Sequence, residues 1–162
     1  VRYMTSNNVN PSFGLCHGTR RGLEQQYFID WFKSQNISVS VLGTEISPTA
    51  TEFKNTIQWD FNEVKDEWVN NVDFIYSNSF DHSFNPTKTI DAWMSCLKDG
   101  GLCFIEWSKD CLTNRPMDPV AGTLDEWVDF FNTKYSVVDI LESTKESGTD
   151  GASKRNIIII QK

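Results

Sequence analysis

The sequence predicts an α/β fold: a doubly wound, mostly parallel seven-stranded sheet with helices on both faces and an antiparallel C-terminal strand hairpin. Three observations predict it. Apolar runs alternate with segments of helical period up to residue 107. The runs Phe74-Ile75-Tyr76 and Cys103-Phe104-Ile105 are almost wholly apolar, as in strands buried on both faces. The last two runs have no helix between them, so they must pair antiparallel. A length of 162 residues fits a single domain, in which residues 1–12 form a poorly structured leader.

The elements follow from local patterns. Apolar runs predict strands at 13–16, 38–46, 56–61, 72–76, 102–107, 137–141 and 156–161. Leu23, Tyr27, Phe28, Trp31 and Phe32 form one stripe of a helix over 22–35. Ser47-Pro48 and Asn85-Pro86 each combine a cap with proline at the first helical position, which predicts a short helix over 48–53 and a longer one that ends at Gly100-Gly101. A brief helical stretch is expected around 66–70, and the capping box Thr123–Glu126 begins a helix over 124–131.

Composition narrows the class of function. Fifteen Lys and Arg against 22 Asp and Glu give a net charge of −7, so we expect no nucleic-acid partner. No apolar run approaches the roughly 20 residues that cross a bilayer, so no membrane partner is expected. The four cysteines form no CxxC pair, and the two histidines complete no zinc-like spacing. We therefore expect a reduced cytoplasmic protein without a metal.

Candidate binding residues lie where the predicted strands end, because open α/β sheets bind ligands at the carboxyl ends of their strands. The first strand leads into a turn, Gly14-Leu15-Cys16-His17-Gly18-Thr19-Arg20, in which glycine permits close backbone approach. Glu45 at the end of the second strand could accept hydrogen bonds from a ribose diol. Asp60 lies between two rings, Trp59 and Phe61, that could sandwich a base. A polar run, 77–83, follows the fourth strand directly.

These segments resemble the class I S-adenosylmethionine (SAM)-dependent methyltransferases. The resemblance rests on the FGLCHGTR turn, on GTEIS, QWDF and DFIYSNSFDH, and on LKDGGLCFIEW, and it covers about residues 13–162. It implies that SAM is the cofactor and that the following residues contact it: Gly14, Cys16, His17, Gly18, Thr19, Arg20, Glu45, Ile46, Trp59, Asp60, Phe61, Asn78 and Ser79. Within that set, Glu45 would hold the ribose, Ile46 and Asp60 the adenine, and Asn78 and Ser79 the methionine end.

The first turn departs from the family pattern, which reads acid-x-Gly-x-Gly-x-Gly. Here the acid is missing and two of the three glycines are replaced, so the ammonium of the cofactor needs another acceptor. Arg20 could meet the cofactor carboxylate instead. Each assignment has an ordinary structural alternative: Asp60 could cap the following turn, Trp59 and Phe61 could be core rings, and Asn78 could satisfy local backbone groups.

Methyl transfer from a sulfonium needs orientation of the reactants, and it needs a general base only when the acceptor is a hydroxyl that loses its proton. His82 is the candidate base or acceptor-orienting group, assisted by Asp81, although hydrogen bonding at a helix entry explains His82 equally well. We expect a SAM-dependent methyltransferase that acts on a small-molecule or carbohydrate-like acceptor. Two alternatives remain: a non-catalytic SAM-binding module, and an NAD-dependent oxidoreductase, which would lack its usual GxGxxG fingerprint.

Overall fold

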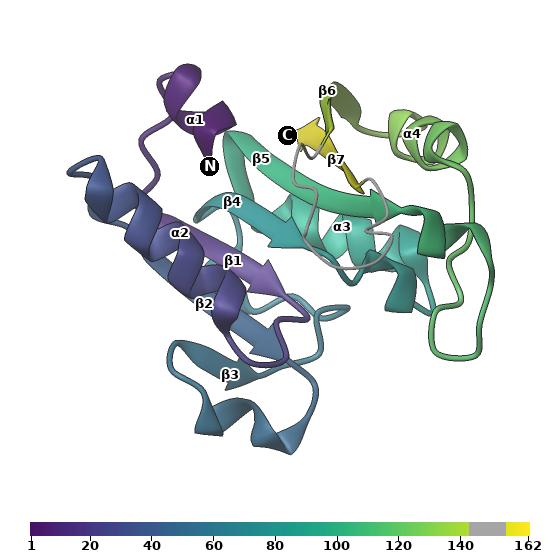
Figure 1. The fold of residues 1–162 in the computed structure, drawn as a ribbon, viewed down its shortest axis with the longest axis horizontal. Helices are drawn as coiled ribbons and strands as arrows, with labels where there is room; N and C mark the ends of the chain where they lie inside the picture. Colours follow the sequence, from purple (N-terminus) through teal and green to yellow (C-terminus); the bar gives the residue numbers. More distant parts are fainter. Residues whose placement is uncertain (143–154) are drawn as a thin grey trace, which may run out of the picture.

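A computed structural model describes residues 1–142 and 155–162. In these ranges the chain forms a seven-stranded sheet in the order β3-β2-β1-β4-β5-β7-β6 (Figure 1). The strands are β1 (Phe13–His17), β2 (Ser40–Glu45), β3 (Thr56–Gln58), β4 (Val72–Ser77), β5 (Leu97–Ser108), β6 (Ser136–Glu142) and β7 (Arg155–Gln161). β1 to β5 pair in parallel, whereas β7 pairs antiparallel with both β5 and β6. The predicted doubly wound sheet and its terminal antiparallel pair are therefore confirmed.

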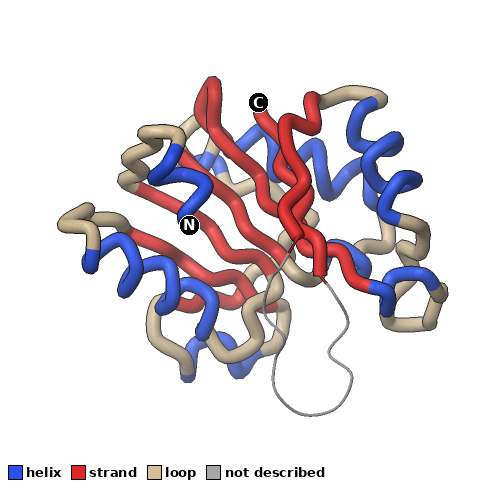
Figure 2. Tube along the Cα trace, turned by 45° about the horizontal axis from the view of Figure 1, so that its top comes forward, coloured by secondary structure: helices blue, strands red, loops and turns tan. Residues whose placement is uncertain are grey.

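Helices cover both faces of the sheet (Figure 2). The α-helices are α1 (Arg2–Ser6), α2 (Leu23–Ser34), α3 (Pro86–Cys96) and α4 (Leu124–Asn132), and the 3₁₀ turns are η1 (Pro48–Glu52), η2 (Asp66–Trp68), η3 (Phe80–His82) and η4 (Lys109–Leu112). On one face, Phe28 and Phe32 of α2 pack on Phe74 of β4. On the other, rings of α3 and α4 meet around Phe80. No helix of the described residues is long and apolar enough to cross a membrane.

The N-terminal segment is more ordered than the sequence predicted. Residues 1–12 were expected to lack an element, but α1 forms over Arg2–Ser6. Its Met4 is fully buried among the residues that line the α2 face of the sheet, and Asp73 accepts hydrogen bonds from the backbone N–H groups of Ser12 and Phe13 at 2.8 and 2.9 Å. Burial of the Met4 side chain and these hydrogen bonds stabilise the N-terminal segment, although its polar composition predicts no element.

Two boundaries also differ from prediction. α3 ends at Cys96 rather than at Gly100-Gly101, because Leu97 is fully buried and pairs with Val72 as the first residue of β5. β3 ends at Gln58, because the chain turns at Asp60, whose side chain accepts the N–H of Asn62 at 2.9 Å. The expected connection between the last two strands, 143–155, lies almost wholly outside the described residues. The capping box of α4 is confirmed, with the Thr123 hydroxyl accepting from the N–H of Glu126 at 3.2 Å.

Candidate functional site

The turn after β1 is held by the end of β2. The N–H groups of Gly18 and Thr19 both donate to the carbonyl oxygen of Thr44, at 2.9 and 3.1 Å. Gly18 has a φ of +72° and Arg20 a φ of +48°, so the chain reverses through two left-handed residues. The glycine suits this conformation, whereas arginine takes it at a conformational cost. The turn is thus fixed by backbone bonds to β2, without the glycine at position 20 that the family pattern has.

Glu45 binds this turn through its side chain. Its Oε2 accepts the N–H of Arg20 at 3.1 Å and its Oε1 accepts the N–H of Ser47 at 3.0 Å, while its carbonyl oxygen accepts the N–H of Trp59 at 3.0 Å. An ionised carboxylate offers about four lone-pair positions, so the two side-chain bonds leave capacity for a hydroxyl donor. The structure therefore brings Glu45 and the predicted turn together, with the carboxylate half-buried.

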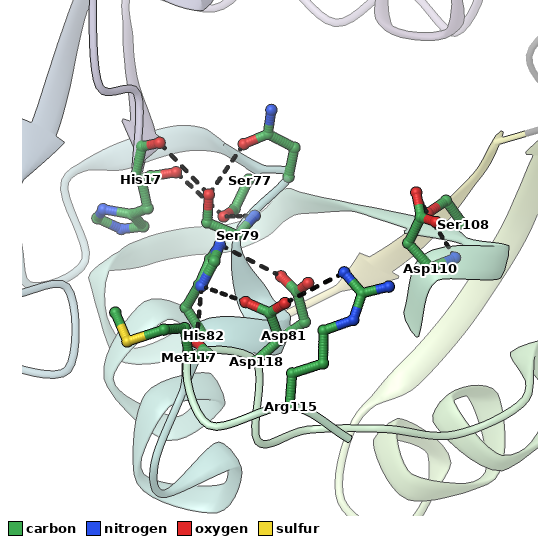
Figure 3. Close-up of polar contacts among 12 residues, drawn as sticks. His17, Ser77, Ser79, Asp81, His82, Ser108, Asp110, Arg115, Met117 and Asp118 are labelled. Carbon is green, nitrogen blue, oxygen red and sulfur yellow. Dashed lines mark hydrogen bonds and ion pairs between the residues drawn. The ribbon is translucent and has the colours of Figure 1, made fainter. Parts of the chain in front are cut away.

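The end of β4 closes against the same turn (Figure 3). The Ser79 hydroxyl lies 3.3 Å from the carbonyl oxygen of Gly18 and 3.0 Å from Oδ1 of Asn78, and the Ser77 hydroxyl donates to the carbonyl oxygen of His17 at 3.1 Å. A Cβ atom built on Gly18 would lie 2.6 Å from both Cβ and Oγ of Ser79. The close approach of β1 and β4 therefore requires glycine at position 18.

Three predicted residues of this turn point into the protein. Gly14 packs against the ring of Phe74, the Cys16 side chain is fully buried, and the His17 side chain is 3% exposed. The His17 ring stacks on Trp93 with centroids 4.9 Å apart, and burial lowers the pKa of His17 to about 3. Any contact of these residues with a ligand would therefore come from backbone atoms.

The adenine candidates lie beside Glu45. The side chain of Ile46 is 67% exposed, and Asp60 is engaged locally, because its Oδ1 accepts from both the N–H and the side-chain amide of Asn62. Trp59 donates its indole N–H to the carbonyl oxygen of Glu63 at 2.9 Å, and Phe61 packs near His17. The predicted capping role of Asp60 and the core packing of the two rings are thus visible, while Ile46 offers a free apolar surface.

Glu24 in the first turn of α2 is a residue that sequence reasoning missed. Its Oε2 is buried without a hydrogen-bond partner among the described residues, and its Oε1 lies 3.5 Å from the side-chain amide of Asn78. Burial, and then the charge of Glu106, raise the pKa of Glu24. The available signal was its place directly after the turn at Gly22, where an acid at a helix start faces the same rim as the strand ends.

His82 lies at the end of η3 and contacts the loop between β5 and α4 (Figure 3). Its Nδ1 is 2.9 Å from Oδ1 of Asp118 and 2.9 Å from the carbonyl oxygen of Met117, whereas its Nε2 is 3.9 Å from Oδ1 of Asp81. Asp118 was not predicted, because it lies 36 positions after His82 in a loop of no regular pattern. The sequence could not show which acid of this loop reaches the imidazole.

The ligand atoms of Asp81, His82 and Asp118 lie within 4.8 Å of one another, which raises the question of a cation. The carbonyl oxygen of Met117 can only accept a hydrogen bond, so its 2.9 Å contact requires a proton on Nδ1 of His82. A protonated Nδ1 cannot bind a metal, which leaves Nε2 as the ring nitrogen that could, 3.9 Å from Oδ1 of Asp81. Because Asp118 is engaged with Nδ1, the arrangement fits a hydrogen-bonded acid–imidazole pair better than a cation site.

Two shallow hollows of the described surface have volumes of about 400 and 370 Å³. One is lined by Ile29, Lys33, Asn36, Ile37, Ser38 and Val39, and the other by Asn62, Glu63, Val64, Lys88, Asp91, Ala92 and Ser95. The first hollow lies beside the end of α2 and the start of β2, at the opposite end of that strand from Glu45, whereas the second reaches Asn62, which donates to Asp60.

No family model and no curated protein matches the sequence. Solved structures do match the fold. The 1,6-didemethyltoxoflavin N1-methyltransferase of Burkholderia thailandensis, solved with S-adenosylhomocysteine, aligns over 99% of this chain and 75% of its own, with a TM-score of 0.71 and 13% identity. A SAM-dependent methyltransferase of Clostridium acetobutylicum aligns over 99% of this chain and 87% of its own, with a TM-score of 0.71 and 9% identity.

The methyltransferase domain of the citrinin polyketide synthase aligns over 93% of this chain, with a TM-score of 0.69 and 14% identity, but this chain spans only 46% of that protein's length. At these identities the likeness concerns the fold. Together with the strand order and the antiparallel β7, it shows that the chain has the fold of the class I SAM-dependent methyltransferases.

Proposed function

We propose that this protein binds SAM at the rim formed by the ends of β1, β2 and β4 and transfers its methyl group to a small-molecule acceptor. One observation carries the proposal: in a sheet of methyltransferase topology, the carboxylate at the end of β2 binds the turn after β1, through the Glu45–Arg20 hydrogen bond at 3.1 Å. The end of β2 and the turn after β1, which would hold opposite ends of the ligand, are therefore already fixed to each other.

The residues at the rim fit the cofactor. Glu45 would accept from the ribose hydroxyls, and Ile46 would cover the adenine, to which Asp60 is the proposed polar partner. Gly18 lets the turn approach closely, and Asn78 and Ser79 would meet the methionine end. Thr19 and Arg20 complete the turn, and Trp59 and Phe61 flank the adenine side.

Glu24 supplies what the altered turn lacks. The first turn has no acid to accept the ammonium of SAM, and Glu24 holds a buried carboxylate oxygen without a partner beside Asn78. A desolvated anion is stabilised by a cation, so an ammonium at this place would satisfy an oxygen that otherwise stays unsatisfied. We therefore assign Glu24 to the cationic end of the cofactor.

SAM supplies an activated methyl group on a sulfonium, so the protein's part is to orient the two reactants and exclude water. His82, with Asp81, stands where the acceptor would approach, three residues beyond Ser79 along the chain. The small-molecule methyltransferase of B. thailandensis is consistent with a small acceptor, and the carbohydrate-like alternative stays within this proposal.

Isothermal titration calorimetry with SAM, S-adenosylhomocysteine and NAD tests the proposal. We expect both sulfur ligands to bind and NAD to give no heat, and SAM incubated with mixed hydroxyl, amine and thiol compounds to yield S-adenosylhomocysteine. Binding of both ligands without turnover on any acceptor would instead identify a non-catalytic SAM-binding module, and binding of NAD alone would identify an oxidoreductase.

A further inference from the structure

We propose that Asp118 positions His82 as a proton acceptor, so that Nε2 of the imidazole takes the proton of an acceptor hydroxyl. This proposal deepens the proposed function, because it names the class of acceptor, and it rests on a contact between two segments that are distant in sequence. η3 follows β4, and the Arg115–Asp118 turn follows β5. The two segments meet at the ring of His82 (Figure 3).

The hydrogen-bond partners of Nδ1 define the tautomer. Asp118 Oδ1 and the Met117 carbonyl oxygen both lie 2.9 Å from this nitrogen, and a carbonyl oxygen and an ionised carboxylate can only accept. The neutral ring must therefore carry its proton on Nδ1. Its lone pair is then on Nε2, the nitrogen that a base uses.

The turn that presents Asp118 is itself fixed. The N–H of Arg115 donates to the carbonyl oxygen of Asp118 at 3.1 Å, and the N–H of Asp118 donates back at 3.0 Å. Nη1 of Arg115 lies 3.9 Å from the second carboxylate oxygen, Oδ2. The N–H of Val120 also donates to the carbonyl oxygen of Asp81 at 3.1 Å, which is a second tie between the loop and η3.

Nε2 remains accessible. The side chain of His82 is 47% exposed, and Nε2 lies 3.9 Å from Oδ1 of Asp81, too far for a direct hydrogen bond. A hydroxyl oxygen placed off the line between these two atoms could be within hydrogen-bond distance of both. The titratable and charged groups around the ring are Asp81 on η3, Asp118 and Arg115 on the loop, and Cys111 of η4, which interacts electrostatically with Asp81.

The chemical step is balanced. His82 Nε2 takes the hydroxyl proton while the acceptor oxygen bonds to the methyl carbon, and the carbon–sulfur electron pair stays on sulfur. A thiolate has no proton to lose, and a neutral amine attacks through its lone pair, so neither needs a base at the moment of attack, whereas a hydroxyl does. The geometry thus points to a hydroxyl-bearing acceptor.

Side-chain ¹⁵N NMR tests the proposal without any ligand. The chain has two histidines, so the signals that disappear in His82→Gln are those of His82. In the neutral ring of His82 we expect mainly the Nδ1–H tautomer, although a free imidazole side chain in water favours Nε2–H. A dominant Nε2–H form in the unmodified protein would overturn the proposal.

Asp118→Asn is the decisive variant. Its amide can donate to an unprotonated Nδ1, and the charged acceptor is lost, so the ratio of Nδ1–H to Nε2–H should fall about tenfold. Asp110→Asn removes the same charge from the same loop, where Asp110 contacts Ser108, and should leave the ratio unchanged. Equal ratios in both variants would show that Asp118 has no positioning role.

Addition of Mn²⁺ alone distinguishes a cation site at Asp81, His82 and Asp118 from the proposed hydrogen-bonded pair. Paramagnetic broadening of the His82 signals at micromolar Mn²⁺ in the unmodified protein, absent in Asp118→Asn, would overturn the proposal in favour of metal binding, and unbroadened signals support it. All of these measurements omit SAM, so their outcome is independent of whether the calorimetry above confirms cofactor binding.

Discussion

The Glu45 carboxylate accepts the backbone N–H of Arg20 at 3.1 Å, so a side chain at the end of β2 fixes the turn after β1. If this carboxylate also holds the ribose, Glu45→Ala should weaken the binding of S-adenosylhomocysteine by about tenfold or more, because hydrogen bonds to a charged group are lost. Calorimetry measures this affinity. Glu52→Ala, an exposed acid of η1, is the control and should bind normally. Equal affinity in both variants would remove Glu45 from the site.

Glu24→Gln should separate binding from stability. Replacement of a carboxylate that has one unpartnered oxygen, and whose pKa is raised by burial and by Glu106, should leave the free energy of unfolding at pH 7 unchanged or increased. The affinity for SAM should fall about tenfold, because the acceptor for its ammonium loses its charge. Urea unfolding and calorimetry give the two quantities. A loss of stability with unchanged affinity would contradict the assignment of Glu24 to the cofactor.

Gly18→Ala and Gly100→Ala form a matched pair. Both glycines have a left-handed φ, +72° and +77°, so alanine should cost about 1–2 kcal/mol at either position. At Gly18 the new Cβ also meets Ser79 at 2.6 Å, whereas at Gly100 nothing lies within 4 Å. We expect a further loss of about 1–3 kcal/mol for Gly18→Ala alone, from overpacking. Urea denaturation compares them, and equal losses would show that the β1–β4 contact is not tight.

The buried His17 should make stability depend on pH. Its pKa is lowered to about 3 by burial, whereas the unfolded side chain takes up a proton near pH 6.5. Between these values the unfolded state binds more protons, so stability falls as the pH falls, by about 1.4 kcal/mol per pH unit. From pH 6.5 to 4.5 the unmodified protein should therefore lose about 2 kcal/mol more than His17→Asn. Parallel urea curves for the two proteins at both pH values would refute this.

Thr123→Ala tests the start of α4. The Thr123 hydroxyl accepts from the N–H of Glu126 and the Glu126 carboxylate accepts from the N–H of Thr123 at 2.7 Å, so the substitution should cost about 1 kcal/mol. Thr87→Ala, at an exposed position in the first turn of α3, should cost less. Thermal or urea unfolding measures the difference, and a neutral Thr123→Ala would mean that packing of Trp127 and Phe131 alone fixes this helix.

Local patterns were sufficient for most of the fold. Proline after Asn85 and the Thr123–Glu126 box define where helices begin, because capping is an interaction within one turn of the chain. The boundaries of the helices and strands that depend on non-local contacts were less predictable from the sequence. The early start of β5 at Leu97 depends on its partner Val72, and the α1 helix depends on the burial of Met4, and neither contact is local. Propensity gives way to packing at such positions.

In the candidate site, too, some features could be predicted from the sequence and others depended on non-local contacts. Glu45, Gly18 and Ser79 could be predicted to lie together because the ends of adjacent parallel strands meet at one edge of the sheet. The direction of a side chain could not be predicted in the turn, where Cys16 and His17 point inward. The partner of His82 was also beyond the sequence, because the loop after β5 has no periodicity that would place Asp118 against η3.

The position of β7 between β5 and β6 has a consequence for biosynthesis. A ribosome delivers residues 136–142 before residues 155–161, yet within the described residues β6 has no neighbour in the sheet except β7. Until the four isoleucines Ile157–Ile160 emerge, the apolar edge of β5 stays unpaired on the nascent chain. Unpaired edges of this kind recruit other strands, so the protein should depend on chaperone protection until residues 155–161 have been translated.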